Sequence, residues 1–377
     1  MSELPRVGIL TSGGDCPGLN AVIRSVVKAS TRFGYEVVGF KRGYEGLIDP
    51  PDYMFLDRKN TLGIIARGGT ILGSTNKGHF SARRGVSERI DLDPRLIDKV
   101  RQTYKDLRLE ALICVGGDGS LAVAEQFEEA GLPVVGVPKT IDNDLSSTAF
   151  SFGFDSAVAC ATDAIDRLYT TAISHERVMV VEVMGRHAGW IALHAGISGG
   201  ASVILLPEIP WTFENVCRKI EERDRDGKRF SIVVVAEGAQ LPGGNLVTIG
   251  EPSGPAMAQV HLGGIGDVVA REIEHRLQRE VRSVVLGHLQ RGGPPTYFDR
   301  MLATQYGAHA VRLVVQRRFG EMVCYHPPEI SSVPIRVAVG KLSQVPRDGS
   351  AIQAARALGI CFGEHAPGES IRALGWR

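Results

Sequence analysis

Short runs of β-branched residues alternate along the chain with segments of helical length, and this alternation limits the possible folds more than any other feature. The first run, Val7–Leu10, ends in a glycine-rich turn, and the apolar residues of the following segment, about Asn20 to Phe33, recur at helical spacing. Such alternation is typical of βαβ units with parallel strands. We therefore expect an α/β protein made of three-layer α/β/α domains with mainly parallel sheets. Further strands are expected at Glu36–Phe40, Ala111–Val115, Val134–Val137, Val178–Val183, Val203–Leu206, Ile232–Ala236 and Ser283–Leu286.

The balance of charge narrows the class of partner. The 377 residues include 43 Lys and Arg against 42 Asp and Glu, a net charge of +1. This balance gives no overall electrostatic argument for binding nucleic acid or an anionic membrane, although it is compatible with a local basic pocket. No apolar run approaches the roughly 18 residues of a membrane helix, and the first residues lack a secretory signal pattern. The six cysteines contain no Cys-x-x-Cys pair and are typical of reduced thiols. We expect a cytoplasmic protein that binds neither nucleic acid nor membranes.

Glycine is in excess, at 45 of 377 residues, or about 12% against a usual level of about 7%. Two glycine clusters, Ser12–Gly18 and Gly116–Ser120, follow predicted strands and contain Gly-Gly-Asp. Backbone N–H groups of such a turn before a helix can bind phosphate, although glycine pairs also serve tight turns by geometry alone. In the second turn, Asp118 stands where a carboxylate could hold Mg²⁺ against phosphate oxygens.

A third polar segment, Val137–Asp144, also follows a predicted strand. Asp142 and Asp144 are two residues apart, so in extended backbone they would face one side together and could divide base and metal roles. Lys139 and Thr140 precede them and add groups that bind phosphate. The alternative interpretation of the same residues is an Asx-rich turn.

Four arginines adjoin predicted strand ends, and Arg side chains can converge on an anion as bidentate clamps. They are Arg177, Arg186, Arg282 and Arg291. Taken singly, each is more often a solvated surface charge, and His288 is more often a buried histidine than a ligand contact.

Two other catalytic motifs fail on their context. Gly196–Gly200 matches a serine-hydrolase elbow but follows a helical segment, the reverse of what that motif requires. Lys139 and Thr140 follow a proline rather than a glycine, so they form no Walker A loop.

Five ordered motifs resemble those of the phosphofructokinase family, the Mg²⁺-dependent enzymes that phosphorylate fructose 6-phosphate. They are Leu10–Asn20, Gly116–Ser120, Thr140–Asp144, Glu182–Arg186 and Gly287–Gly293, and the similarity runs from Gly8 to about Tyr306. The resemblance implies two domains. Residues 1–153 with approximately 288–345 would bind the donor and Mg²⁺, and residues 154–287 with approximately 346–377 would bind fructose 6-phosphate.

The resemblance also implies roles for the matching residues. Asp142 would be the general base toward the sugar 1-hydroxyl, Thr140 would contact the transferring phosphoryl group, Asp144 and Arg186 would support catalysis, and Asp118 would hold Mg²⁺. Donor binding is implied for Gly14, Gly116, Gly117, Gly119, Ser120, Lys77 and Lys139. Sugar phosphate binding is implied for Arg177, Met184, Gly185, Arg186, Glu237, Arg282, His288 and Arg291. In the family, the residues matching Arg177 and Arg282 come from a neighbouring subunit, which implies at least a homodimer and usually a homotetramer.

Two positions bear on the phosphoryl donor. Members of the family that use ATP usually carry small residues at the positions of Gly119 and Lys139, whereas pyrophosphate-dependent members carry Asp and Lys. We take Gly119 as the stronger signal, because it leaves room for a nucleotide α-phosphate and a flexible lysine can move aside. The prediction is therefore ATP-dependent formation of fructose 1,6-bisphosphate, the committed step of glycolysis. A pyrophosphate-dependent reversible enzyme and a non-catalytic regulatory subunit that binds sugar phosphate remain as alternatives.

The chain departs from the family pattern elsewhere. Lys77 stands near the place of a donor-bridging arginine, as a point charge instead of a fork. The allosteric effector positions are partly kept, with Arg24, Lys28, Arg58 and Lys228 present but Tyr169 and Ser202 in place of an arginine and a glutamate. We expect no regulation by nucleoside diphosphate through that site. The sequence gives no functional account of the segment after about residue 320.

Overall fold

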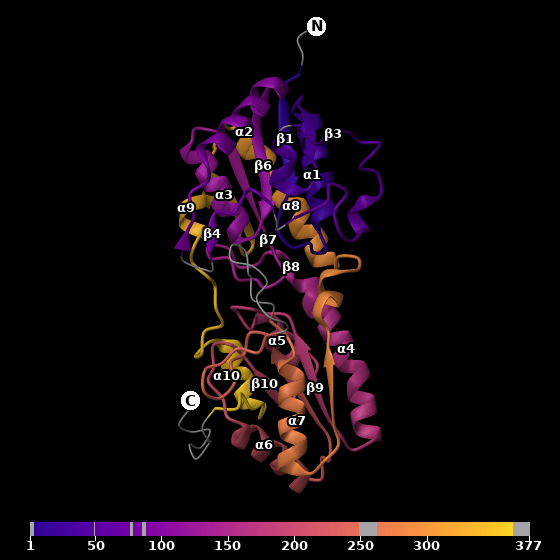
Figure 1. Ribbon diagram of the computed structural model, residues 1–377. Coiled ribbons are helices and arrows are strands. Elements are labelled where there is room, and N and C mark those ends of the chain that lie inside the picture. Colours follow the sequence, from indigo (N-terminus) through magenta and orange to yellow (C-terminus); the bar gives the residue numbers. More distant parts are fainter. Residues whose placement is uncertain (1–3, 49, 76–77, 85–87, 249–261, 365–377) are drawn as a thin grey trace. The chain divides into compact units, whose positions relative to one another are not determined.

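The computed structural model describes residues 4–48, 50–75, 78–84, 88–248 and 262–364 (Figure 1). The chain forms two compact units. Unit 1 comprises Met1–Ser156 and Arg291–Ser343, and unit 2 comprises Ala157–Gln290 and Gln344–Arg377. The chain therefore leaves unit 1, returns to it and ends in unit 2.

Unit 1 is built on a sheet with the strand order β14-β13-β7-β6-β1-β2-β3, and the short strand β8 pairs with β7. The inner pairs are parallel, and the edge pairs β2–β3 and β13–β14 are antiparallel. The strands are β1 (Arg6–Thr11), β2 (Glu36–Phe40), β3 (Tyr53–Leu56), β6 (Leu109–Gly116), β7 (Val134–Thr140), β8 (Phe152–Gly153), β13 (Glu321–His326) and β14 (Glu329–Pro334). A separate two-stranded ribbon joins β4 (Arg83–Arg84) to β5 (Glu88–Arg89).

Helices cover both faces of this sheet. They are α1 (Leu19–Arg32), α2 (Pro94–Leu107), α3 (Asp118–Glu129), α8 (Tyr297–Val315) and α9 (Ile335–Ala338), with 3₁₀ turns η1 (Gly43–Leu47) and η2 (Ile64–Ala66). Alternate strand residues such as Leu10 and Cys114 form one buried cluster with α2, α3 and α9. Helices α1 and α8 pack on each other, and α8 also contacts β7, yet neither contributes to that cluster. Full burial of a large apolar side chain of the cluster, such as Leu10, contributes roughly 1.5–3 kcal/mol to the stability of the fold.

Unit 2 carries an all-parallel sheet with the order β10-β11-β9-β12. Its strands are β9 (Val178–Val183), β10 (Val203–Leu205), β11 (Ser231–Ala236) and β12 (Val281–Val285). Its helices are α4 (Phe154–Ser174), which begins in unit 1, α5 (Trp190–Ser198), α6 (Phe213–Arg225), α7 (Ile265–Leu277) and α10 (Ser350–Ala357), with η3 (Gly287–Arg291) after β12. Val180, Val216 and Val269 belong to one buried cluster that joins the sheet to α6 and α7, whereas α5 contacts β10 and β11.

These sheets confirm the predicted α/β class with mainly parallel strands. One local prediction is wrong: Asp142 and Asp144 do not lie in extended backbone. The strand β7 ends at Thr140, and Asn143 has φ +51°, in the left-handed region. The Asn143 Oδ1 atom accepts a hydrogen bond from the Ser151 N–H at 2.9 Å, so the segment is a side-chain-stabilised turn.

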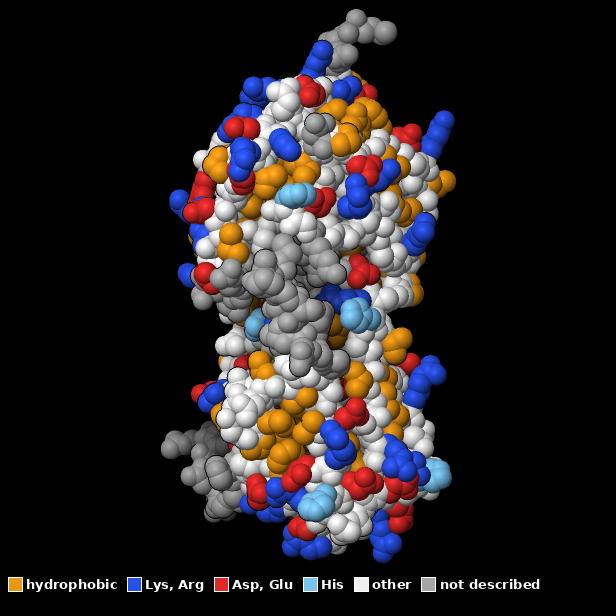
Figure 2. All heavy atoms as spheres, viewed as in Figure 1, with side chains coloured by type: hydrophobic (Ala, Val, Ile, Leu, Met, Phe, Trp, Pro, Cys, Tyr) orange, Lys and Arg blue, Asp and Glu red, His pale blue; other side chains and the backbone are white. Residues whose placement is uncertain are grey.

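The segment after residue 320, which the sequence left unexplained, contributes to both units. The hairpin β13–β14 adds two strands to the sheet of unit 1. Residues 344–364 belong to unit 2, where Cys361 forms an isolated parallel β-bridge with Val203 of the edge strand β10. In the described residues, no helix combines the length and apolar character that crossing a membrane requires. Figure 2 shows acidic and basic side chains intermingled on the visible face of each unit.

Candidate active site

Three polar turns predicted to bind the donor follow adjacent strands in unit 1. Strands β1, β6 and β7 run parallel, with Thr11 in register with Val115 and Gly116 in register with Pro138. The turns after them therefore emerge at the same edge of the sheet, although the first lies about a hundred positions before the other two in sequence. Carboxyl ends of parallel strands are where open α/β sheets bind ligands.

Hydrogen bonds with Lys139 and with the loop residues Ser74 and Thr75 hold the first glycine turn in place. The Lys139 Nζ atom donates a hydrogen bond to the Gly14 carbonyl, and burial lowers the pKa of this ammonium below its ordinary value. The Ser74 hydroxyl donates to the Gly13 carbonyl at 2.5 Å, and the Gly13 N–H donates to Thr75 O at 3.1 Å. The loop that contains Ser74 and Thr75 is therefore hydrogen-bonded to the first glycine turn. Lys77, predicted to bind the donor, lies outside the described residues.

In the second turn, one glycine is needed by the fold and another is not. A Cβ at Gly116 would lie 2.3 Å from the Ser120 Cβ, so no side chain fits there. A Cβ at Gly119 would meet no atom within 4 Å, and its φ lies outside the left-handed region. Because the fold does not require glycine at position 119, room for a ligand is a ready explanation for its presence.

Asp118 and Asp144 lie close together beside these turns. Asp118 is the first residue of α3, where the helix dipole favours a carboxylate, and its Oδ1 accepts a hydrogen bond from the Gly340 N–H at 2.7 Å. Burial raises the pKa of Asp144, a hydrogen bond from Thr140 opposes this rise, and the Asp118 charge adds to it. The Asp142 N–H donates to the Thr140 Oγ1 at 3.1 Å. The structure thus gathers these residues at one edge of unit 1.

Arg291 also contacts the first turn. Its Nη1 donates to Asp15 O at 3.1 Å, and a Cβ at Gly14 would lie 2.8 Å from the same nitrogen. Arg291, predicted to bind the sugar 6-phosphate, therefore lies beside a glycine predicted to bind the donor. His288, predicted to share its role, is exposed on η3.

Four residues predicted to bind the sugar lie at the carboxyl ends of β9 and β11 in unit 2. They are Met184, Gly185, Arg186 and Glu237. The two segments are joined by a hydrogen bond from the Glu237 N–H to Val183 O at 2.8 Å. The Met184 N–H donates to Oε1 of the fully buried Gln290 at 2.8 Å. Sequence reasoning assigned Gln290 no role, although the residue lies inside one of the five motifs.

The two arginines predicted to reach a neighbouring subunit lie at the other end of the same sheet. Arg177 directly precedes β9, and Arg282, the second residue of β12, is in register with Met179. Because strands advance about 3.3 Å per residue, the seven steps from Arg177 to Met184 span roughly 20 Å. Arg177 and Met184 of one chain therefore cannot hold the same sugar.

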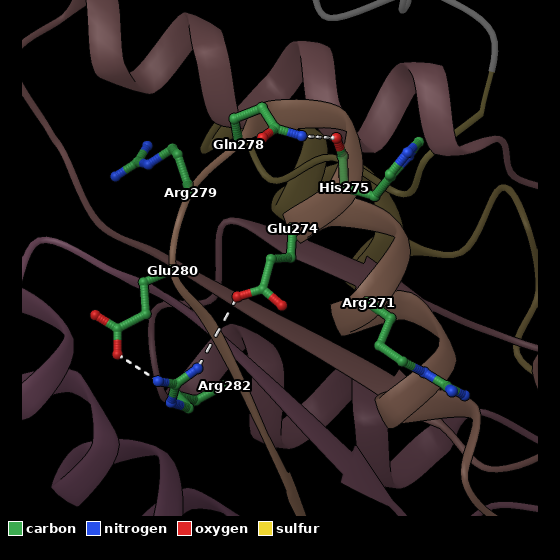
Figure 3. Close-up of a pocket in the computed structure, with 7 residues that line it drawn as sticks. All are labelled: Arg271, Glu274, His275, Gln278, Arg279, Glu280 and Arg282. Atoms are coloured by element: carbon green, nitrogen blue, oxygen red, sulfur yellow. Dashed lines mark hydrogen bonds and ion pairs between the residues drawn. The ribbon is translucent and has the colours of Figure 1, made fainter.

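An open hollow of about 500 Å³ surrounds Arg282 (Figure 3). Its lining residues are Arg271, Glu274, His275, Gln278, Arg279, Glu280 and Arg282. Glu280 Oε1 pairs with Arg282 Nη2 at 2.7 Å and with Arg177 Nη2 at 3.2 Å. One carboxylate thus holds both guanidinium groups on the same surface of unit 2.

The family can be assigned by comparison with known proteins. The sequence model of the family described as Phosphofructokinase matches residues 6–314. The chain belongs to the phosphofructokinase family. ATP-dependent 6-phosphofructokinase of Chloroflexus aurantiacus is 50% identical over 363 residues, which are 96% of this chain and 99% of that protein. ATP-dependent 6-phosphofructokinase 1 of Synechocystis sp. is 46% identical over 370 residues, or 96% of this chain and 99% of that protein.

Solved phosphofructokinases share the fold. The structure of Pichia pastoris phosphofructokinase in the T-state matches with a TM-score of 0.78 and 29% identity over 96% of this chain, which spans 37% of the length of that protein. Pyrophosphate-dependent phosphofructokinase of Nitrosospira multiformis has a TM-score of 0.78 and 20% identity, with 97% of this chain and 94% of that chain covered. At that identity, the second likeness shows the fold alone.

Two further findings bear on ligands of this phosphofructokinase. Within the described part of the chain, no group of three or more His, Cys, Asp or Glu side chains is arranged to hold a metal ion. At the position that the resemblance assigns to the effector site, the Tyr169 ring packs edge-on against Phe230, with ring centroids 5.1 Å apart. The Arg223 guanidinium lies over the Phe230 ring, 5.4 Å from its centroid. An edge-on aromatic pair therefore occupies the position at which the resemblance implies an arginine.

Proposed function

We propose that the chain transfers the γ-phosphoryl group of ATP to the 1-hydroxyl of fructose 6-phosphate, giving fructose 1,6-bisphosphate in glycolysis. The observation that carries this proposal is the convergence of Asp118, Thr140 and Asp144 on the two glycine turns at one edge of unit 1. The names of relatives that are 46–50% identical over nearly their whole length support ATP as the donor.

The residues of unit 1 suit phosphoryl transfer. Its transition state is loose, so catalysis depends mainly on positioning and on compensating negative charge. Asp142 would accept the proton of the sugar hydroxyl, while Thr140 would contact the transferring phosphoryl group. The Gly13–Gly14 and Gly116–Ser120 turns would present backbone N–H groups to the donor phosphates.

The carboxylates of unit 1 also fit Mg²⁺. Proteins commonly bind this ion through one or two carboxylates together with substrate phosphates, and the Asp118 charge contributes to the raised pKa of Asp144. Asp118 would hold the ion, and Asp144 would support the site. When bound, Mg²⁺ would neutralise the charge that develops on the donor phosphates.

Unit 2 would bind fructose 6-phosphate through Met184, Gly185, Arg186 and Glu237, with His288 at its 6-phosphate. The family resemblance assigns Arg291, a residue of unit 1, to the same phosphate. The separation of roughly 20 Å between Arg177 and Met184 supports a site shared between chains, with Arg177 and Arg282 supplied by a second copy. We therefore propose at least a homodimer, and a homotetramer as in the usual family assembly. A cytoplasmic location fits six cysteines that are all free.

The open space at Gly119 supports ATP over pyrophosphate. Lys139 does not decide between the two donors, because its ammonium donates to the carbonyl of Gly14, a glycine that would itself bind the donor. The open space at Gly119 leaves room for a nucleotide. The pyrophosphate-dependent enzyme remains the second candidate, because Lys139 lies at the same turn that would hold the donor.

A donor comparison tests the proposal. Purified protein is incubated with fructose 6-phosphate and Mg²⁺, and ATP, ADP or pyrophosphate is supplied in parallel while fructose 1,6-bisphosphate is measured. We expect product with ATP. Product with pyrophosphate alone would reverse the donor assignment, and no product with any donor would favour the regulatory subunit.

A further inference from the structure

A short segment that no sequence motif singled out closes on the donor side of unit 1. Residues Ala338–Ser343, which we call the strap, run on from β14 and the short helix α9. Ala338 O accepts a hydrogen bond from the Ser146 hydroxyl at 3.0 Å, and Leu342 forms an antiparallel bridge with Leu145. The Ser343 N–H donates to Asp144 O at 2.8 Å. The strap is therefore fastened along the turn that carries Asp142 and Asp144.

The middle of the strap contacts the proposed magnesium ligand. The Gly340 N–H donates to Asp118 Oδ1 at 2.7 Å, across a sequence separation of 222 residues. Gly340 has φ +77°, a conformation that side chains rarely adopt. Hydrogen bonds on both sides of Lys341, at Gly340 and at Ser343, thus fix the backbone that carries this lysine.

Lys341 directly follows the residue whose N–H binds the Asp118 carboxylate. Its Cα lies about 3.8 Å from that of Gly340, and its ammonium sits on a flexible four-carbon stem. Lys341 is exposed, and in the described part of the chain no hydrogen bond or ion pair holds its side chain. The neighbouring Lys139, by contrast, is buried with its ammonium on a carbonyl.

We propose that Lys341 is a donor-binding residue whose ammonium pairs with the phosphates of the nucleotide held beside Asp118. This inference rests on the proposed function for the identity of the donor. The fixed backbone keeps the Cα of Lys341 beside Asp118, and the flexible stem lets the ammonium reach the phosphates. The contact is electrostatic, and it therefore depends on the number of phosphate charges in the ligand and weakens with salt.

The test is nucleotide binding without metal. Calorimetric titrations in EDTA give the dissociation constants of ATP and AMP for the wild type, Lys341→Met, Lys341→Arg and the matched control Arg336→Met. Arg336 is an exposed cation on α9, two residues before the strap. We expect Lys341→Met to weaken ATP binding about fivefold, the factor for one pair of unit charges 4 Å apart in water. Lys341→Arg and Arg336→Met should bind ATP as the wild type does, and AMP binding should change less than ATP binding.

Three outcomes would overturn the proposal: equal ATP affinities for Lys341→Met and Arg336→Met, equal losses for ATP and AMP, or an ATP loss in Lys341→Met that high salt leaves unchanged. Lys341→Gln is the second variant, in case methionine impairs folding, which unfolding midpoints would reveal. A wild type that binds ATP but forms no fructose 1,6-bisphosphate would refute the proposed function, while the binding comparison would still decide the role of Lys341.

Discussion

Replacing Asp299 by Asn should change how stability depends on pH. Asp299 lies in the first turn of α8 and is fully buried. Its Oδ2 accepts hydrogen bonds from the Ser156 N–H at 2.8 Å and from the Ser156 hydroxyl at 2.5 Å. Burial outweighs these bonds and raises the pKa of Asp299 from 3.8 to about 6. Between these two pH values, the folded protein binds more protons than the unfolded chain.

This difference in bound protons decides whether the free energy of unfolding rises or falls with pH. A carboxyl with a raised pKa in the folded state stabilises the fold fully below its unfolded pKa, and that stability is lost as the pH rises through about 6. A shift of about two units corresponds to about 3 kcal/mol over the whole window, of which about 1.3 kcal/mol falls between pH 5 and pH 7. The amide of the Asp299→Asn variant cannot titrate, so the variant lacks this component.

Urea unfolding of the wild type and Asp299→Asn, followed by far-ultraviolet circular dichroism at pH 5, 6 and 7, measures the effect. The free energy of unfolding of the wild type should fall by about 1.3 kcal/mol relative to the variant across this range. Parallel pH profiles, or a wild type that gains stability relative to the variant as the pH rises, would refute the reasoning.

Three further predictions concern the proposed active site. Asp142→Asn should lower kcat by roughly 10²- to 10⁴-fold, the usual scale of general-base loss, with ATP binding retained; an unimpaired kcat would reject the assigned base. Gly14→Ala places a methyl group 2.8 Å from Arg291 Nη1, so steady-state kinetics should show higher KM values. Since only the flexible end of Arg291 must move, the unfolding midpoint should stay near that of the wild type, and unchanged KM values would contradict the contact. Arg282→Ala and Asp142→Asn subunits, each impaired alone, should recover activity when unfolded together and refolded as mixed oligomers, because one hybrid site then carries both native residues. No recovery would count against sites shared between chains.

The α/β class and the donor-side turns were predictable because they depend on local chemistry. Short β-branched runs followed by Gly-Gly-Asp encode a strand, a turn and a helix start within some twenty residues. The residues Asp118, Thr140 and Asp144 were found in the same way, from carboxylates and hydroxyls that directly follow predicted strands. The local conformation of the third turn was not predicted, because the side chain of Asn143 accepts a hydrogen bond from Ser151, eight residues later.

The sequence by itself therefore determined the fold class, the family and the five motifs that supply most residues of the proposed site. Only the tertiary structure decided which of them lie together: it separates Arg177 from Met184 along β9, directs Lys139 to the Gly14 carbonyl and brings Gly340 to Asp118 across 222 residues. The physical reason is that backbone conformation responds to near neighbours in the chain, whereas contacts between distant residues depend on the order and register of the strands that carry them.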